Sequence, residues 1–563
     1  MAKEPENLSA VTAAETEAAS SEAFQGPTVA EAPSRRKGLR FWLVFLGLCL
    51  AGFLSATDST IIFTALPTIS SDLGGQAQYI WLGNAYVFAS TAIQPLYGQI
   101  SNIFGRRYPM IASVGLFAVG SGIAGGANTA VMFIAGRLVQ GLGGGGTVML
   151  IDLIVCDLLP LRERSTYLGA VLGACAVGTV IGPVLGGALV SRASWRWAFW
   201  INLPVCALTL AIMILFLRVS WQKSPSWMHM VARIDYLGNT IFVGSITSIL
   251  IGLVQGGAVH PWGAWQTIVP LVVGFVGWAL FFVQQAYFCK EPTMPLRLFA
   301  HRTAASVYLQ DFIVSVLLQW CIYVFPLYFQ SQLAASALDS GLNILPINAF
   351  MIPSGAVAGA ILTKIGQYKP LHWAGFAVLA VSCGLFSTMS ASTSTVAWAW
   401  FQILAGIGVG LPLTTQLPAI QAVLPESETA VSTSTYSFIR SFGFVWGATI
   451  PSIVFNSHID VRLASIDDAQ VRAALANGGA YSYALKVRDL TGLILEQTLD
   501  VYRGALRAVW LVGLGFALVG FLLVFTEKHV DMRVTLETEF GLEETGKQPT
   551  ELNVVADETE KVA

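Results

Sequence analysis

The sequence predicts an all-α polytopic membrane protein, built from two six-helix halves with two additional helices inserted between them. Three observations predict this fold. Apolar residues make up 55% of the 563 residues and charged residues only 11%, whereas soluble proteins carry about 25% charge. Fourteen apolar segments reach the length of about 20 residues that a transmembrane helix needs, and part of the pattern recurs in the second half. So few polar groups cannot cover a globular surface, which excludes a soluble enzyme.

The expected spans follow one another in order along the chain. They lie near residues 41–63, 79–100, 108–127, 129–151, 166–190, 197–217, 236–255, 266–288, 305–330, 341–363, 371–391, 396–422, 430–455 and 506–526. The resulting segments are a disordered tail (1–40), a six-helix half (41–217), a linker with two helices (218–290), a second half (291–526) and an acidic tail (527–563). The long loop 456–505 is expected outside the cell, with an amphipathic surface helix near 484–502.

The charges of the short loops indicate the orientation of the chain. Basic residues gather before the first span and in alternate connections, while the intervening short loops hold almost none. They are Arg35, Arg36, Lys37, Arg40, Arg106, Arg107, Arg162, Arg164, Arg218, Lys223, Arg233, Lys290, Arg297, Arg302, Lys364 and Lys369. The positive-inside rule places such loops in the cytoplasm, so both termini are expected there.

Other classes of partner and chemistry find no support in the sequence. The net charge is −2, and a nucleic-acid partner would need a concentrated basic face. The seven cysteines form no CxxC or Cys/His cluster, so neither a metal site nor a disulfide framework is indicated. The stretch Gly141 to Gly146 fits GxGxxG, but it lies in an apolar span without a preceding strand, which argues against a dinucleotide site. We therefore expect no cofactor and no enzyme.

An internal repeat supports the two-half arrangement. The loop Gly98 to Pro109 and the loop Gly359 to Pro370 share Gly, Ile, Gly and Pro at the same spacing, 261 residues apart. Glycine-rich stretches recur in the fourth and twelfth spans, at Gly141 to Gly146 and Gly406 to Gly410. Parallel six-helix repeats are typical of transporters that bind substrate between the halves.

Several motifs resemble those of the major facilitator superfamily, in particular its fourteen-span branch of fungal drug:proton antiporters. Gly98 to Arg107 resembles the signature after the second span, and Arg137-Leu-Val-Gln140-Gly141 resembles the motif of the fourth. The stretch Gly173 to Gly187 resembles the antiporter motif of the fifth span, and Ala56-Thr-Asp58-Ser-Thr60 the motif of the first. The resemblance covers roughly residues 41–526 and implies the major facilitator fold and efflux of small organic molecules.

The resemblance implies gating residues in two places. The first is the signature loop, with Gly98, Asn102, Gly105, Arg106 and Arg107. Asn102 departs from the aspartate that the signature normally carries there. It keeps hydrogen-bonding capacity but loses the charge, so the gate's salt bridge is either weakened or rerouted to Asp157; the alternative is a tolerated substitution.

The second gating element is the fifth span. Pro183 is expected to break this helix after Gly182, because proline lacks an N–H and clashes with the previous turn. Gly178, Gly182, Gly186 and Gly187 leave one face without side chains, and helices pack closely at such faces. This face is expected to form a pliable contact between the halves, or to be ordinary small-residue packing.

Charged residues inside the spans are candidates for proton coupling, because each one costs about 2.5–3.5 kcal/mol to insert. Asp58 lies deep in the first span and can bind and release a proton. Arg137 cannot lose its charge and needs a partner in the protein; in the resembling proteins it is tied to proton coupling. Gln140 lies one turn further on the same face and can hold it in place.

Three more charged residues lie within spans in the sequence, and two of them, Asp311 and Arg440, are further candidates for proton coupling. Asp311 is one-third of the way into the ninth span and either helps to bind a cationic substrate or lies near headgroups. Arg440 in the thirteenth span is expected to pair across the cavity. Asp152 is expected to be a solvated residue near the inner end of its helix.

The sequence therefore predicts a proton-coupled exporter of drugs, toxins or secondary metabolites that works by alternating access. Its partners are a small-molecule substrate, protons and the lipid bilayer, and it acts as a monomer in the plasma membrane. Candidate substrate-binding residues are Trp81, Asn84, Tyr86, Tyr328 and Gln330. The alternatives are a transporter of a siderophore, amino acid or polyamine, also at the vacuolar or a vesicle membrane, and a membrane sensor that transports nothing.

Overall fold

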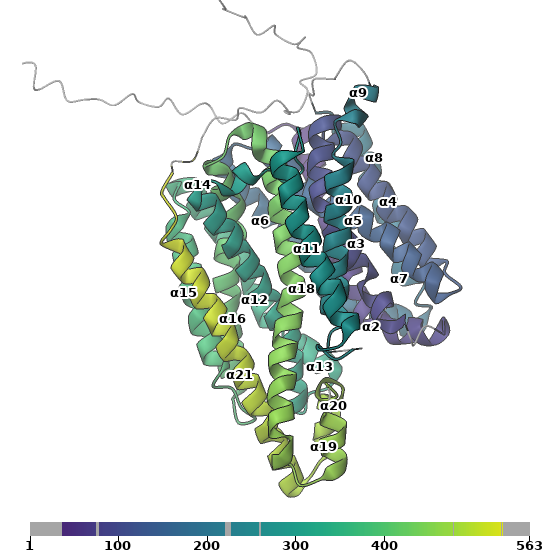
Figure 1. The fold of residues 1–563 in the computed structure, drawn as a ribbon, viewed down its shortest axis with the longest axis vertical. Helices are drawn as coiled ribbons and strands as arrows, with labels where there is room; N and C mark the ends of the chain where they lie inside the picture. Colours follow the sequence, from purple (N-terminus) through teal and green to yellow (C-terminus); the bar gives the residue numbers. More distant parts are fainter. Residues whose placement is uncertain are drawn as a thin grey trace, which may run out of the picture. The chain divides into compact units, whose positions relative to one another are not determined.

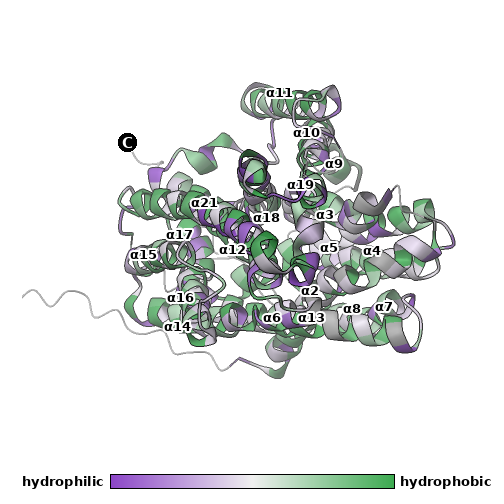
Figure 2. Cartoon of the chain, turned by 90° about the horizontal axis from the view of Figure 1, so that it is seen from below, coloured by the Kyte–Doolittle hydropathy of each residue, from purple (hydrophilic) through white to green (hydrophobic). Residues whose placement is uncertain are grey.

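The structure is a computed structural model that describes residues 37–74, 78–219, 227–257, 260–476, 478–530 and 532. These residues form helices and no strand, which confirms the all-α fold class predicted from the sequence. The two predicted tails lie almost entirely outside the described residues. Figure 1 shows the helices running roughly alongside one another, and Figure 2 shows that hydrophobic residues dominate most of them.

The first half comprises six spans. Its helices are α2 (Leu39–Asp72), α3 (Tyr79–Phe104), α4 (Arg107–Gly125), α5 (Ala130–Leu158), α6 (Leu161–Arg192), α7 (Trp197–Trp200) and α8 (Asn202–Phe216). The sixth span is interrupted at Ile201, where α7 ends and α8 begins. The Thr129 side chain caps α5 by accepting a hydrogen bond from the Met132 N–H.

The inserted helices and the second half follow. The inserted part comprises α9 (Trp227–Ala232), α10 (Tyr236–Gln255) and α11 (Trp265–Tyr287). The second half comprises η2 (Leu296–Phe299), α12 (Arg302–Gln332), α13 (Ala337–Leu342), α14 (Leu345–Ile365), α15 (Lys369–Phe386), α16 (Thr395–Leu413), α17 (Gln416–Ala422), η3 (Glu426–Glu428), α18 (Thr429–Arg462), η4 (Leu463–Ser465), α19 (Ala469–Leu475), α20 (Ala480–Tyr483), η5 (Ala484–Asp489) and α21 (Gly492–Val524).

The helices are long and apolar enough for a multi-pass membrane protein. Thirteen described helical stretches qualify as membrane spans by length and composition. The remaining predicted span is α3, a helix of 26 residues. Its hydropathy is lowered by polar side chains such as Asn84, Gln94, Gln99 and Asn102. Gln94 and Gln99 are buried, so these two polar groups face protein rather than lipid.

Two local predictions differ from the structure. The expected break at Gly182-Pro183 is absent, because α6 is helical from Leu161 to Arg192; the side chain of Pro183 itself lies outside the described residues. Proline is tolerated in membrane helices when neighbouring groups satisfy the freed backbone carbonyls. The expected surface helix near 484–502 is instead the 3-10 turn η5 followed by the first turns of α21. The buried Val501 and Tyr502 pack there and extend that helix beyond its apolar stretch.

The internal repeat appears as equivalent helix ends. Gly105 ends α3 with φ 78°, and Gly366 ends α14 with φ 74°. Residues with a side chain rarely adopt this positive φ, which explains why glycine recurs at both positions. We call the end of the bundle at which the short loops carry Arg106, Arg107, Arg162, Arg164, Lys364 and Lys369 the basic end. It is the upper end in Figure 1, opposite α19 and α20.

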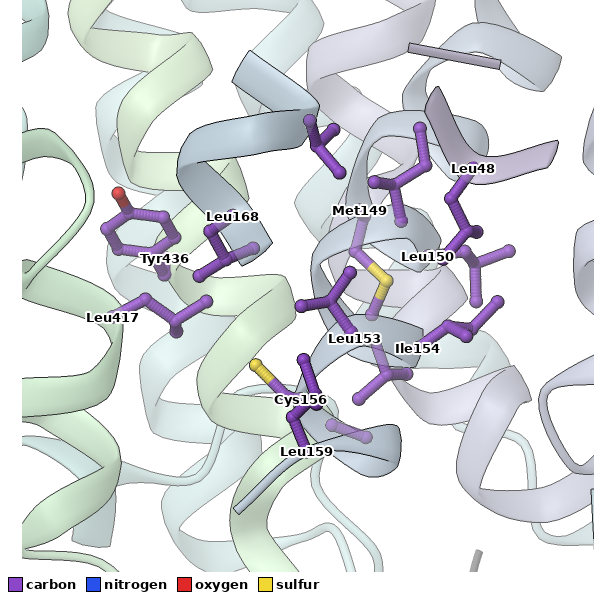
Figure 3. Packing of buried hydrophobic residues seen from close by; sticks show 14 of the residues in the cluster. Leu48, Met149, Leu150, Leu153, Ile154, Cys156, Leu159, Leu168, Leu417 and Tyr436 are labelled. Atoms are coloured by element: carbon purple, nitrogen blue, oxygen red, sulfur yellow. The ribbon is translucent and has the colours of Figure 1, made fainter. Parts of the chain in front are cut away.

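The two halves contact each other mainly through the helix pairs α3 with α18 and α6 with α14, and also through α5 with α18 and α6 with α17. The repeat glycines lie in these contacts. A Cβ on Gly98 would come within 2.2 Å of the Ser434 hydroxyl, and one on Gly359 within 2.8 Å of the Ser165 backbone. One apolar cluster also crosses the boundary, and Figure 3 shows Leu417 and Tyr436 of the second half beside α5 and α6. The basic end of the bundle is therefore closed between the two halves.

The inserted helices α10 and α11 lie side by side, with α10 next to α3 and α18 (Figures 1 and 2). A buried polar cluster fastens them to the first half. The Asp235 carboxylate accepts from the Gly238 N–H at 2.8 Å and from Gln284 at 3.0 Å, and Gln99 of α3 accepts from the Asn239 amide at 3.1 Å. On the α18 side, the contacts are aromatic, for example between Phe242 and Phe438.

Candidate functional site

The strongest candidate site is a buried ion pair inside the first half. The Arg137 guanidinium on α5 donates to Oδ2 of Asp58 on α2 at 2.6 Å. The same guanidinium nitrogen donates to Oε1 of Gln140 at 2.7 Å, and Nε2 of Gln140 donates to the other Asp58 oxygen at 2.7 Å. Arg137 and Gln140 are three residues apart on one helix, so their side chains lie on the same face. All three side chains are at most 1% exposed.

Two residues that the sequence analysis did not name complete the hydrogen bonding around Asp58. Asn202, the first residue of α8, donates to Oδ1 of Asp58 at 2.9 Å. Ser121 of α4 accepts from Gln140 at 2.8 Å. Asp58 thus connects α2, α5 and α8, and Gln140 brings in α4. Neither Asn202 nor Ser121 was predicted from the sequence to contact the ion pair, since these contacts come from helix packing.

Tyr86 of α3 belongs to this cluster. The Arg137 guanidinium lies 4.7 Å from the centre of the Tyr86 ring, in cation–π geometry. The Tyr86 hydroxyl forms a hydrogen bond of 3.1 Å with the Ser55 hydroxyl. Tyr86 was predicted to bind substrate, whereas in the structure its ring packs against the Arg137 guanidinium of the ion pair. The cluster can change its charge balance only through the Asp58 carboxylate, because arginine stays protonated.

A second, partly buried ion pair joins the two halves. Arg440 of α18 donates to Oδ2 of Asp152 on α5 at 2.8 Å, and Ser437 donates to the same oxygen at 3.4 Å. The expectation that Asp152 is solvated is wrong, because it is only 8% exposed. Its position in the sequence suggested an interfacial residue, but α18 covers it in the folded bundle. This pair holds the halves together when both partners are charged.

Asp311 of α12 is buried without a partner. It is 0% exposed, and neither carboxylate oxygen has a hydrogen-bond partner among the described residues. The two alternatives from the sequence were a substrate contact and a position near headgroups. Its complete burial contradicts the second, because headgroups would reach it only at the surface of the bundle.

The basic end contains the signature loop. Arg106 donates from Nε to Oδ2 of Asp157 at 2.7 Å, from Nη1 to the Ser101 carbonyl at 2.8 Å and to Oδ1 of Asn102 at 3.1 Å. Arg106 and Asp157 are buried. The structure thus brings together Arg106 and Asp157, with Asn102 as a neutral acceptor beside them. Arg107 donates to the Ile214 carbonyl of α8 at 2.7 Å.

We expect Asp157→Asn to destabilise the protein more than Asn102→Ala. The first change removes the charge of a buried ion pair, which costs about 3–5 kcal/mol. The second removes one hydrogen bond to a charged donor, which is worth about 1.5–3 kcal/mol. Thermal unfolding in detergent measures both, and equal losses would show that Asp157 does not balance Arg106.

Further contacts close the basic end between the halves. Arg164 of α6 donates to Oε1 of Gln421 at 2.6 Å and pairs with Glu426 at 2.5 Å. Arg162 donates to the backbone carbonyls of Thr363 and Lys364 in α14. The hydroxyls of Thr166 and Thr363 lie 3.1 Å apart. The sequence analysis used the two arginines for orientation and did not assign them to a gate.

The contact between α6 and α14 ends midway along the helices. A Cβ on Gly169 would lie 3.4 Å from Ala356, and one on Gly173 would lie 3.5 Å from Ile352. Val177 and Val180 continue the same face of α6 and are 52% and 41% exposed. The helices therefore separate beyond Gly173, toward the end opposite the basic one.

The glycine face of α6 fits the expectation of ordinary small-residue packing rather than that of a contact between the halves. Added Cβ atoms on Gly178, Gly182 and Gly186 would meet Phe53 O, Thr60 Oγ1 and Thr64 Oγ1 of α2 at 2.0–2.5 Å. This face thus packs within the first half, and the contact between the halves is made by another face of α6. A Cβ on Gly187 would have open space.

The comparison with protein families decides the classification. Residues 48–448 match the family described as the Major Facilitator Superfamily. The chain belongs to this superfamily. Within it, the chain is 51% identical over 509 residues to the MFS efflux transporter aclA of Aspergillus oryzae, covering 90% of this chain and 92% of that protein. It is 43% identical over 528 residues to the efflux pump FUS6 of Gibberella fujikuroi, covering 93% and 95%.

Solved structures of the superfamily share the fold. The human organic anion transporter MFSD10 superposes with a TM-score of 0.57 at 16% identity, covering 87% of this chain and all of that one. The proton:xylose symporter XylE superposes with a TM-score of 0.53 at 13% identity, covering 86% and 94%. At this identity the similarity establishes the major facilitator fold alone.

The remaining candidate substrate residues have different surroundings. Tyr328 is a core residue, because its ring packs among the aromatic side chains of the second half and its hydroxyl donates to the Ser390 carbonyl at 3.0 Å. Trp81 is half-buried and contacts Phe88 edge to face at 5.5 Å. Asn84 and Gln330 are also half-buried. Tyr328 is therefore a poor candidate for a substrate contact, and the other three stay predictions.

Proposed function

We propose that this protein is a proton-coupled efflux transporter that exports small organic molecules by alternating access. Its similarity to the efflux pumps aclA and FUS6 over nine-tenths of the chain supports the transport class. Another relative at 44% identity is named as the transporter of the acurin A biosynthesis cluster of Aspergillus aculeatus. Secondary metabolites are accordingly the substrate class that we propose, with the chain acting as a monomer and without enzymatic activity.

The orientation that we propose places the basic end in the cytoplasm. Most arginines and lysines of the described short loops lie at this end, with Arg192 and Arg196 as exceptions at the other end. The positive-inside rule retains such basic loops on the cytoplasmic side. Both termini are then cytoplasmic, and the plasma membrane is the site of export. In this orientation the structure is closed toward the cytoplasm, and α6 and α14 separate toward the outside. It is the form from which an exporter releases its substrate.

The buried Asp58–Arg137 pair is the observation that carries the proposal of proton coupling. When a proton binds Asp58, the carboxylate loses the charge that balances Arg137. The guanidinium then keeps the contact with Gln140 and the rings of Tyr86 and Phe199, none of which carries a negative charge. An uncompensated charge at this depth costs several kcal/mol, so protonation favours a rearrangement of α2 against α5. This energy biases the rocking of the halves.

The substrate path that we propose runs between the halves. Trp81 and Asn84 on α3 and Gln330 on α12 are half-buried side chains that can contact an amphipathic molecule. Opening toward the cytoplasm has to break the Asp152–Arg440 pair and the contacts of Arg162 and Arg164. This opening is reversible because the broken contacts are polar and water molecules can take the place of the lost partners.

Accumulation assays in a yeast strain without its own efflux pumps test this function. The chain and its Asp58→Asn variant are expressed at equal surface levels, and cells are loaded with a panel of fluorescent amphiphiles and with fungal metabolites. We expect the chain to lower accumulation, and a protonophore or the variant to abolish the effect. Asp500→Asn, the same chemical change on an exposed side chain, serves as the control. Efflux that resists the protonophore would contradict proton coupling, and unchanged accumulation of every compound would contradict export of this class.

A further inference from the structure

Arg440 lies close to two acids that belong to different halves. It is bonded at 2.8 Å to Asp152 of α5 in the first half. Asp311 of α12 belongs to the second half, as does Arg440 itself. The charges of both Arg440 and Asp152 act on Asp311 in this structure. The arginine therefore has one bonded partner across the boundary and one unbonded acid within its own half.

The register of α12 and α18 places Asp311 at the level of the Arg440 turn. Both helices begin at the basic end. The Tyr308 hydroxyl donates to the Ser432 carbonyl at 3.3 Å, and a Cβ on Gly443 would lie 2.8 Å from the Ser315 Cβ. Asp311 lies between these two contacts, opposite the turn that contains Thr435 and Tyr436.

Other polar groups at this level also have no partner. Within the described ranges, the side chains of Ser315, Thr435 and Gln416 have no hydrogen bond, and all three are 0% exposed. Gln416 is the first residue of α17, which contacts α18. Three residues earlier, the Leu413 carbonyl at the end of α16 accepts a hydrogen bond of 3.2 Å from the Tyr436 hydroxyl of α18. Buried polar groups normally have partners. Their accumulation around one acid indicates a site that water enters in another conformation.

The surroundings determine the protonation of Asp311 in the closed form. An ionised carboxylate buried without a partner is strongly disfavoured and takes up a proton instead. The titratable or charged groups near Asp311 are Tyr308 on its own helix, Tyr436 and Arg440 on α18, and Asp152 on α5. The charge of Arg440 is already balanced by Asp152. Asp311 is therefore neutral while the basic end is closed.

We propose that Asp311 is a second proton-binding site. Arg440 causes Asp311 to release its proton when the arginine exchanges Asp152 for Asp311 as its ion-pair partner. Opening of the basic end moves α5 away from α18 and takes Asp152 with it. Arg440 then turns to the acid in its own half. The O–H bond of Asp311 breaks, the proton passes to an incoming water molecule, and the carboxylate remains paired with the guanidinium. This inference rests on the proposed proton coupling and adds a second proton to each cycle.

Distances between nitroxide labels test the exchange without substrate or gradient. Tyr108→Cys and Ile365→Cys place the labels on exposed positions at the basic ends of α4 and α14, one in each half. The half-exposed Cys49, Cys175 and Cys289 are replaced by serine first. In the parent protein, raising the pH is expected to add a longer-distance population, because Asp311 loses its proton and receives Arg440.

Single substitutions give opposite expected shifts. Asp311→Asn resembles the protonated acid and is expected to reduce the longer-distance population at high pH by about fivefold or more. Asp311→Glu is expected to restore it. Asp152→Asn removes the cross-half partner and is expected to raise that population at low pH. Asp500→Asn, an exposed change, should leave the distances as in the parent.

The exchange is overturned if Asp311→Asn reduces the longer-distance population at high pH by less than about fivefold. It is also overturned if Asp152→Asn leaves the basic end closed at low pH. Its failure is separable from that of the proposed function. A transporter that exports in the yeast assay but shows no shift lacks the exchange, whereas one that shows the shifts but moves no compound lacks the export. Elution of each variant as the parent species in gel filtration shows that the comparison concerns folded protein.

Discussion

Replacing Asp58 by asparagine is expected to abolish gradient-driven efflux and to destabilise the protein by about 3–5 kcal/mol. In the parent protein, the amide nitrogens of Gln140 and Asn202 donate to Oδ1 of Asp58 at 2.7 Å and 2.9 Å. The side-chain oxygen of asparagine can still accept these hydrogen bonds. It cannot balance the charge of Arg137, which is 1% exposed. The expected loss therefore arises from one uncompensated buried charge. Efflux and thermal unfolding of the same preparation measure the two effects.

A double variant separates coupling from stability. In Asp58→Asn with Arg137→Gln, both charges are removed together and the hydrogen-bonding groups remain. We expect most of the lost stability to return while efflux stays absent, because nothing in the cluster can then bind and release a proton. Each single variant is expected to be less stable than the double one. If the double variant instead transported as the parent does, the cluster would be structural and the proton would be carried elsewhere.

Enlarging Gly359 is expected to prevent closure of the basic end. Its added Cβ would lie 2.8 Å from the backbone carbon and oxygen of Ser165 and from the Thr166 nitrogen, so backbone has to move. Overpacking of this kind costs about 1–3 kcal/mol, which shifts a two-state population about 5- to 150-fold. Gly359→Leu should therefore slow efflux by at least about fivefold, with Gly359→Ala between it and the parent. The nitroxide pair on α4 and α14 should report an open basic end.

Gly384 provides the matched control. It lies in α15 of the same half, and a Cβ there would meet open space. Gly384→Leu should leave both efflux and the label distances unchanged. A loss of activity in Gly359→Leu with the labels still at the closed distance would contradict the role of this contact in closure. The symmetry of the fold extends the expectation to Gly98, where an added Cβ would lie 2.2 Å from the Ser434 hydroxyl.

The sequence was sufficient for features that depend on local composition. Apolar stretches of span length located the helices, and the repeat of Gly98 and Gly105 at Gly359 and Gly366 indicated two related halves. Asp58 and Arg137 stood out because charges within spans are rare. Their pairing at 2.6 Å fits the requirement that a buried arginine finds an acid.

Features that depend on contacts between distant helices were missed. Asp152 read as a helix-end residue, because only the folded bundle places Arg440, 288 positions away, against it. Asn202 and Ser121 are ordinary polar residues until α4 and α8 meet Asp58. For the glycine face of α6, a contact between the halves and ordinary small-residue packing both stayed open, since small residues indicate close packing without identifying the helix that approaches. In the structure this face packs on α2 within the first half.

Proton flux and substrate flux in one reconstituted system test the central claim most directly. The purified protein is placed in liposomes that contain a pH-sensitive dye, and a metabolite exported in the yeast assay is added under an imposed pH gradient. We expect the metabolite to accumulate against its own gradient while protons move the opposite way, and both fluxes to vanish in Asp58→Asn but not in Asp500→Asn. Metabolite movement without any proton movement would contradict proton-coupled export.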